Sequence, residues 1–179
     1  MGARGCDSPG LPDIAAGVGT AIALGAYGRL HPPAATVLDV AGFSSGVAAK
    51  AWLTTLATLL ALVQVGSALV LMGRLGGRIP PWTAPLHRWS GRAAVLVTVP
   101  VAVHCLYALG FQTGTPRILV HGIAGCAFYG VFVAKMLALP RRDVPGRAVP
   151  VLGAALVAAL ATLFATAAAW FFVTSGVHL

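Results

Sequence analysis

The sequence predicts an all-α integral membrane protein, a helical bundle with about five transmembrane helices. Of its 179 residues, 58% are hydrophobic and only 9% are charged, whereas a soluble domain carries about 25% charged residues. The mean hydropathy is +0.88. The apolar runs are continuous and rich in Ala and Leu, without the two-residue alternation of a membrane β-barrel. We therefore expect a single transmembrane domain over residues 1–179.

Five apolar runs are close to, or longer than, the roughly 20 residues that a helix needs to cross a bilayer. In chain order, they predict helices at approximately residues 14–30, 47–72, 88–111, 118–139 and 149–173. Glycines dilute the first run, and Asp7 and Asp13 interrupt the apolar core that a signal peptide would need. We expect this run to be a retained helix packed closely against its neighbours, because small residues let backbones approach in lipid.

The arginines predict the orientation of the chain. They are concentrated in the loops expected near residues 73–88 and 140–148, while the opposite loops carry few. Because an excess of Lys and Arg marks the cytoplasmic side, the N-terminus should be cytoplasmic and the C-terminus outside. The net charge of +8 then reflects topology, with acidic lipid headgroups of the bilayer as its partner. No basic surface interleaved with aromatic residues indicates nucleic-acid binding.

Two histidines are predicted at matched depth on consecutive helices. His104 lies about seven residues before the outer end of the third run, and His121 about three or four residues into the fourth. At about 1.5 Å per residue, both lie about 5–10 Å below the outer boundary. Neutral imidazole is the usual ligand of low-spin haem iron in membranes. The pair therefore predicts a haem b with His104 and His121 as its iron-binding, axial residues.

Two neighbouring residues complete the predicted haem site. Arg117 lies four residues before His121 and suits a haem propionate. Gly125 follows His121 in an H-x-x-x-G pattern that recurs from His87 to Gly91. A glycine one turn from the ligand leaves room for a flat macrocycle. Membrane histidines also serve as hydrogen-bonding groups, proton-handling groups or ligands of a lone metal ion, and these alternatives stay open.

A second haem would depend on His87, the one histidine expected on the cytoplasmic side. His87 is seventeen residues from His104, which places the two about 100° apart around an ideal helix. Pro100 lies between them and can rotate the outer half of the helix. A bond from His87 to loop backbone or lipid is the competing interpretation. His31 lies at the outer end of the first run.

The apolar runs contain three more residues that could carry chemistry: Gln64, Cys105 and Cys126. Gln64, in the middle of the second run, predicts an interhelical hydrogen bond, with a haem propionate or a quinone as alternative partners. Cys105 and Cys126 lie close to the histidines in sequence, and buried free cysteine is most often a small apolar filler. The chain has no Ser-His-Asp set, and its four acidic residues lie outside the apolar runs, so neither a hydrolase nor a carboxylate proton pump is indicated.

Four stretches carry a resemblance to known proteins: KAWLTTLA from Lys50, LHRWSGR from Leu86, HCLYALGFQT from His104 and HGIAGCAFYGVFVAKM from His121. From about His31 to Trp170, the chain resembles an uncharacterised bacterial family of small five-helix membrane proteins. More distantly, it is similar to cytochrome b561-type and ferric-reductase-like haem membrane proteins. That similarity implies His104 and His121 as axial ligands, with His87 and His31 as candidates for a second site. The chain lacks two clear pairs on one stripe, which puts a two-haem relay in doubt.

Together, these features predict a b-type cytochrome-like protein of the bacterial cytoplasmic membrane that mediates one-electron transfer. It would serve as the electron-transfer component of an oxidoreductase, with a quinol or a redox protein as partner. Whether it forms a homo- or hetero-oligomer stays open. The alternative is a non-redox membrane subunit or small transporter whose histidines hydrogen-bond or handle protons.

Overall fold

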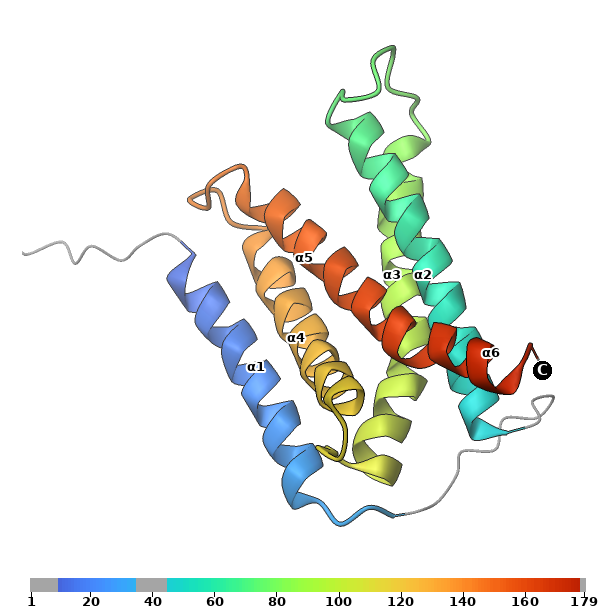
Figure 1. The fold of residues 1–179 in the computed structure, drawn as a ribbon. Helices are drawn as coiled ribbons and strands as arrows, with labels where there is room; N and C mark the ends of the chain where they lie inside the picture. Colours follow the sequence, from blue (N-terminus) through green and yellow to red (C-terminus); the bar gives the residue numbers. More distant parts are fainter. Residues whose placement is uncertain (1–9, 35–44, 178–179) are drawn as a thin grey trace, which may run out of the picture. The chain divides into compact units, whose positions relative to one another are not determined.

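The computed structural model describes residues 10–34 and 45–177 (Figure 1). Within these residues every regular element is helical, which confirms the predicted all-α class. The elements are α1 (Leu11–Leu30), α2 (Gly46–Leu71), α3 (Thr83–Val103), the π-helical turn η1 (His104–Leu109), α4 (Pro116–Ala138), α5 (Ala148–Leu163), the π-helical turn η2 (Phe164–Ala169) and α6 (Trp170–Ser175).

Four helical stretches of the described chain are long and apolar enough to cross a membrane. They are Gly46–Leu71, Thr83–Leu109, Pro116–Ala138 and Ala148–Ser175, with mean hydropathies of 1.9, 1.7, 1.6 and 2.2. The structure thus confirms membrane-type helices in the last four predicted runs. The first run also forms a helix, but α1 is not among these four, because glycines and Asp13 dilute its apolar character.

The chain divides into two compact units. Unit 1 contains α1, α4 and α5 up to Thr162, and unit 2 contains α2, α3, η1, η2 and α6. In unit 1, α1 packs along α4, and in unit 2, α2 packs along α3 (Figure 1). The C-terminal part of unit 2 also packs on α2, where Ala48 and Ala51 are buried with Ala168 and Phe171.

Small residues let the backbones of α1 and α4 touch. A Cβ atom added to Gly17 would lie 2.5 Å from the carbonyl oxygen of Gly130 and 2.9 Å from Cβ of Ala134. A Cβ added to Gly130 would lie 2.5 Å from the carbonyl oxygen of Gly17. Any larger residue would collide with backbone, and not with a side chain that can move aside. The expectation that the glycine-rich first helix packs closely against a neighbour is confirmed.

Helix α3 begins five residues earlier than the sequence analysis predicts. It starts at Thr83, whose N–H donates to the carbonyl oxygen of Pro80 at 3.1 Å. The sequence analysis gave a start at about residue 88, because the prolines before it are typical of a loop. Pro85 lies in the first turn of α3, where its missing N–H breaks no hydrogen bond of the helix. As a result, His87 lies inside α3 and not in a loop.

Helix α4 begins at two residues that favour a helix start, Thr115 as the N-cap and Pro116 as the first helical residue. The Thr115 side chain accepts a hydrogen bond from the N–H of Ile118 at 3.3 Å, and Pro116 occupies the first helical position, where its missing N–H costs nothing. Arg117 therefore belongs to the helix. It shares a helix face with His121, one turn later, as the sequence predicts.

Candidate functional site

His104 is the buried histidine of unit 2. It is 5% exposed and is the first residue of η1, in a stretch with a mean hydropathy of 1.7. Pro100 lies inside α3 one turn before it, and η1 ends at Gly110, which has a φ of +68°. A single π-helical turn inside a helix is frequently found at a functional site. The structure thus gives His104 a buried position at a local change of helix geometry.

Four side chains form a hydrogen-bonded group between α2 and α3, which we call the α2–α3 polar cluster: Gln64, Ser67, His87 and Ser90. Gln64 Nε2 donates to the carbonyl oxygen of His87 and, at 2.7 Å, to Ser90 Oγ. Ser67 Oγ lies 2.9 Å from His87 Nδ1. The interhelical hydrogen bond predicted for Gln64 is confirmed. The structure bonds His87 to a side chain of the neighbouring helix, whereas the competing sequence interpretation was loop backbone or lipid.

Gly91 makes room for this cluster. A Cβ atom added to Gly91 would lie 3.0 Å from Gln64 Oε1. The glycine one turn after His87 was expected to leave space for a macrocycle. In the structure that space holds the Gln64 amide, so the first H-x-x-x-G pattern serves helix packing.

In unit 1, His31 and His121 belong to the same end of one helix pair. The N–H of Phe111 donates to the carbonyl oxygen of Gly28 near the end of α1, at 2.6 Å. The Phe111 ring packs over Gly122 near the start of α4, where an added Cβ would lie 3.0 Å from the ring. Phe111 therefore joins the end of α1 to the start of α4, which lie together in Figure 1.

The His31 ring is held by stacking. His31 caps the C-terminus of α1, and its ring stacks on Tyr27 with centroids 5.0 Å apart and an interplanar angle of 12°. His31 therefore lies at the C-terminal end of the first helix, where the sequence analysis placed it; the side of the membrane stays a prediction. Gly125 lies on α4, half-buried, one turn after His121.

The structure groups the predicted site residues by unit. Unit 1 holds His31, Arg117, His121 and Gly125, and unit 2 holds His87 and His104. The two predicted axial ligands therefore belong to different units, His104 to unit 2 and His121 to unit 1. Within the described residues, no three His, Cys, Asp or Glu side chains are grouped as for a metal ion. A haem iron needs fewer protein side chains as ligands than a lone metal ion does, because the porphyrin supplies the other ligands.

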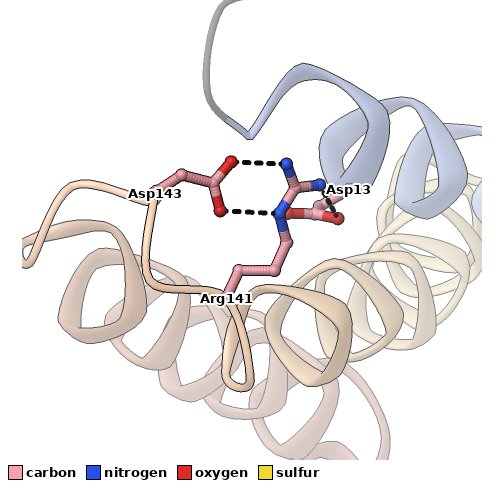
Figure 2. Close-up of polar contacts among 3 residues, drawn as sticks. All are labelled: Asp13, Arg141 and Asp143. Carbon is pink, nitrogen blue, oxygen red and sulfur yellow. Dashed lines mark hydrogen bonds and ion pairs between the residues drawn. The ribbon is translucent and has the colours of Figure 1, made fainter.

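A charged cluster in unit 1 was not predicted. Arg141, in the loop after α4, donates to Asp143 Oδ2 at 2.6 Å, to Asp143 Oδ1 at 3.1 Å and to Asp13 Oδ1 at 3.1 Å (Figure 2). The Asp13 side chain is only 9% exposed, and its Oδ2 atom is buried without a hydrogen-bond partner in the described structure. The cluster joins the first turn of α1 to the loop between α4 and α5.

Hydrogen bonding between Arg141 and the carboxylates also shifts pKa values in this cluster. Its hydrogen bonds hold the pKa of Asp143 below the ordinary value of 3.8, and the two carboxylates raise the pKa of Arg141. Asp143 and Arg141 are therefore both charged at neutral pH. Asp13 and Arg141 are 128 residues apart in the sequence, so no local pattern indicates their contact. The short spacing from Arg141 to Asp143 was the one local signal.

Across residues 10–34 and 45–177, the chain is all-helical, with four membrane-type helices and polar side chains paired between helices. The chain belongs to the family of unknown function DUF6529, whose profile matches residues 11–179. This match agrees with the expected membership of an uncharacterised family. Searches of curated proteins and of solved structures found no match.

Proposed function

We propose that this protein is a b-type cytochrome-like membrane protein that binds haem through His104 and His121 and mediates one-electron transfer. The observation that carries the proposal is the burial of His104 at the start of a π-helical turn in an apolar stretch. An ionisable residue in such a stretch is a functional candidate by default. Neutral imidazole, the form that apolar surroundings favour, is also the form that ligates iron.

Each proposed residue has a defined task. His104 and His121 would hold the iron, and Arg117, one turn before His121 on α4, would pair with a propionate. Haem, when bound, supplies reversible one-electron iron chemistry.

The same proposal includes the topology. We infer five membrane-crossing helices, with α1 as the fifth, because its contact with α4 at Gly17 and Gly130 supports a helix that is less apolar than the others. Arg74 and Arg78 follow α2, and Arg142 and Arg147 follow α4. These loops and the N-terminus would then lie on the cytoplasmic side of a bacterial membrane.

The absorption spectrum of the purified full-length protein tests this function. We expect a Soret band and sharp α and β bands on reduction, and loss of the pigment in the double variant His104→Ala with His121→Ala. Cys105→Ala, next to His104 in sequence, is the matched control and should keep full pigment. A folded but colourless wild-type protein, or pigment that survives the double substitution, would overturn the proposal.

The second candidate is a non-redox membrane subunit or small transporter whose histidines hydrogen-bond or handle protons. The α2–α3 polar cluster favours it, because there a histidine takes part in hydrogen bonding between helices. The two candidates separate in the same experiment, since this second class gives protein without haem bands.

A further inference from the structure

Lys135 places a basic side chain in the last turn of α4. The helix ends at Ala138, and its apolar stretch has a mean hydropathy of 1.6. Lys135 is half-buried. An ammonium group that is removed from water costs free energy unless an acceptor or an anion faces it. A partner for Lys135 is therefore expected.

The described part of unit 1 contains no such partner. Across residues 10–31 and 111–162, the carboxylates are those of Asp13 and Asp143. Arg141 binds both oxygens of Asp143 and one oxygen of Asp13. Within these same residues, Lys135 makes neither a hydrogen bond nor an ion pair. An anion that pairs with Lys135 must therefore come from elsewhere.

Helix α5 leaves space beside this ammonium group. A Cβ atom added to Gly153 would lie 3.4 Å from Lys135 Nζ. Apart from the neighbouring residues of α5 itself, no other atom of the described structure lies within 4 Å of that Cβ. Lys135 thus extends from α4 to a point on α5 that carries no side chain. A small anionic group can approach the ammonium there.

The loop between α4 and α5 adds positive charge at the same end of the hairpin. Arg142 and Arg147 are both exposed, and among the described residues neither has an ion-pair partner. Arg141, by contrast, is neutralised by its two carboxylates. Lys135, Arg142 and Arg147 therefore give this end an excess of positive charge that attracts anions.

We propose that Lys135 binds the phosphate of an anionic phospholipid head group in the space beside Gly153. The end of a membrane-type helix lies at the level of the lipid head groups, and basic sites between such helices bind anionic head groups. Lys binds phosphate as a compact point charge. Arg142 and Arg147 increase the local concentration of anionic lipid through their charge. The inference goes beyond the proposed function, because it holds with or without haem.

Native mass spectrometry of the full-length protein in detergent micelles tests the site. The probes are phosphatidylglycerol and phosphatidylcholine with the same acyl chains. We expect tighter binding of phosphatidylglycerol, because the cations repel the choline group. Lys135→Met should weaken this binding at least about tenfold, the value of a hydrogen bond to a charged group, and should leave phosphatidylcholine binding unchanged.

Arg74→Met is the matched control for charge. It removes an exposed cation after α2 and should change the affinity little. Equal affinity of the parent for the two lipids, or the same loss in Arg74→Met as in Lys135→Met, would overturn the inference. Circular dichroism confirms that the variants compared have equal helical content.

A glycine variant tests the space beside the ammonium without changing the charge. Gly153→Val should weaken phosphatidylglycerol binding, whereas Gly146→Val, where an added Cβ meets nothing within 4 Å, should not. Unchanged affinity in Gly153→Val, or an equal loss in Gly146→Val, contradicts the position of the site.

Inorganic phosphate distinguishes the source of the anion. An excess of it should not displace phosphatidylglycerol, because the acyl chains hold only the lipid beside the helices. Displacement that depends on Lys135 would assign the site to a free anion and refute the lipid assignment.

Discussion

The two helix pairs of this protein are held together by different means. Helices α1 and α4 touch through their backbones at Gly17 and Gly130, and their polar contacts lie at the two ends. Helices α2 and α3 are joined within their apolar stretches by polar side chains. In lipid, association of helices depends on packing and hydrogen bonds, because the tails are as apolar as the helix surfaces. One pair uses close packing and the other uses hydrogen bonds.

This difference indicates which substitutions should change more than the packing of helices. A close backbone contact holds helices together without placing any reactive group between them. A hydrogen-bonded pair fixes the orientation of side chains, including the ring of His87. We therefore expect substitutions in the α1–α4 contact to affect helix packing, and substitutions in the α2–α3 polar cluster to affect the orientation of His87 as well.

The largest effect is expected from a large side chain at the backbone contact. Gly17→Leu should destabilise unit 1 by about 1–3 kcal/mol, because the neighbouring atoms include backbone that cannot move aside. Oxidative cross-linking between a cysteine at Gly25 and Cys126 measures this, since an added Cβ at Gly25 lies 3.8 Å from Cys126 Sγ. The cross-link should form efficiently in the parent and poorly with Gly17→Leu.

Gly19→Leu is the control for that prediction. An added Cβ at Gly19 meets nothing within 4 Å, so the cross-link should persist. Equal cross-linking in both leucine variants would show that the contact at Gly17 does not hold the pair.

A smaller effect is expected when Gln64 is replaced by Leu. Two hydrogen bonds to α3 are lost, which should cost about 1 kcal/mol, since such bonds in membrane proteins contribute modestly. A double-mutant cycle with Ser90→Ala, measured by denaturant titration in micelles, isolates the coupling between the two residues. Leu62→Ala, two residues before Gln64 at a position that is 61% exposed, should show no coupling with Ser90→Ala. Additive effects of Gln64→Leu and Ser90→Ala would contradict the cluster.

The smallest effect concerns the end of the α1–α4 pair and depends on pH. Because Arg141 lowers the pKa of Asp143 in the folded protein, the pair contributes stability above the ordinary pKa of 3.8 and loses it as the pH falls through the lowered value. Asp143→Asn should therefore show less loss of thermal stability on acidification than the parent. An identical loss of thermal stability at low pH in the two proteins would show that this contact is not coupled to folding.

The sequence anticipated the elements better than their contacts. Continuous apolar runs predicted the helices, and the polar Gln64 in such a run predicted its interhelical bond. The early start of α3 was missed because Pro85 is typical of a loop but also fits the first turn of a helix. The contact of Ser67 with His87 spans 20 residues and that of Asp13 with Arg141 spans 128, and neither has a local pattern. The assignment of His104 and His121 as a haem pair stays a prediction.

The close contact of α1 with α4 has a consequence for biosynthesis. Helix α1 is not among the helices apolar enough to cross a membrane by composition, and its partner begins at Pro116, long after α1 ends at Leu30. We expect a ribosome to have made most of α4 before α1 can settle beside it. In the proposed five-helix topology, the insertion machinery or another early helix would shelter the glycine-rich surface until then, so truncation before α4 should leave α1 poorly integrated.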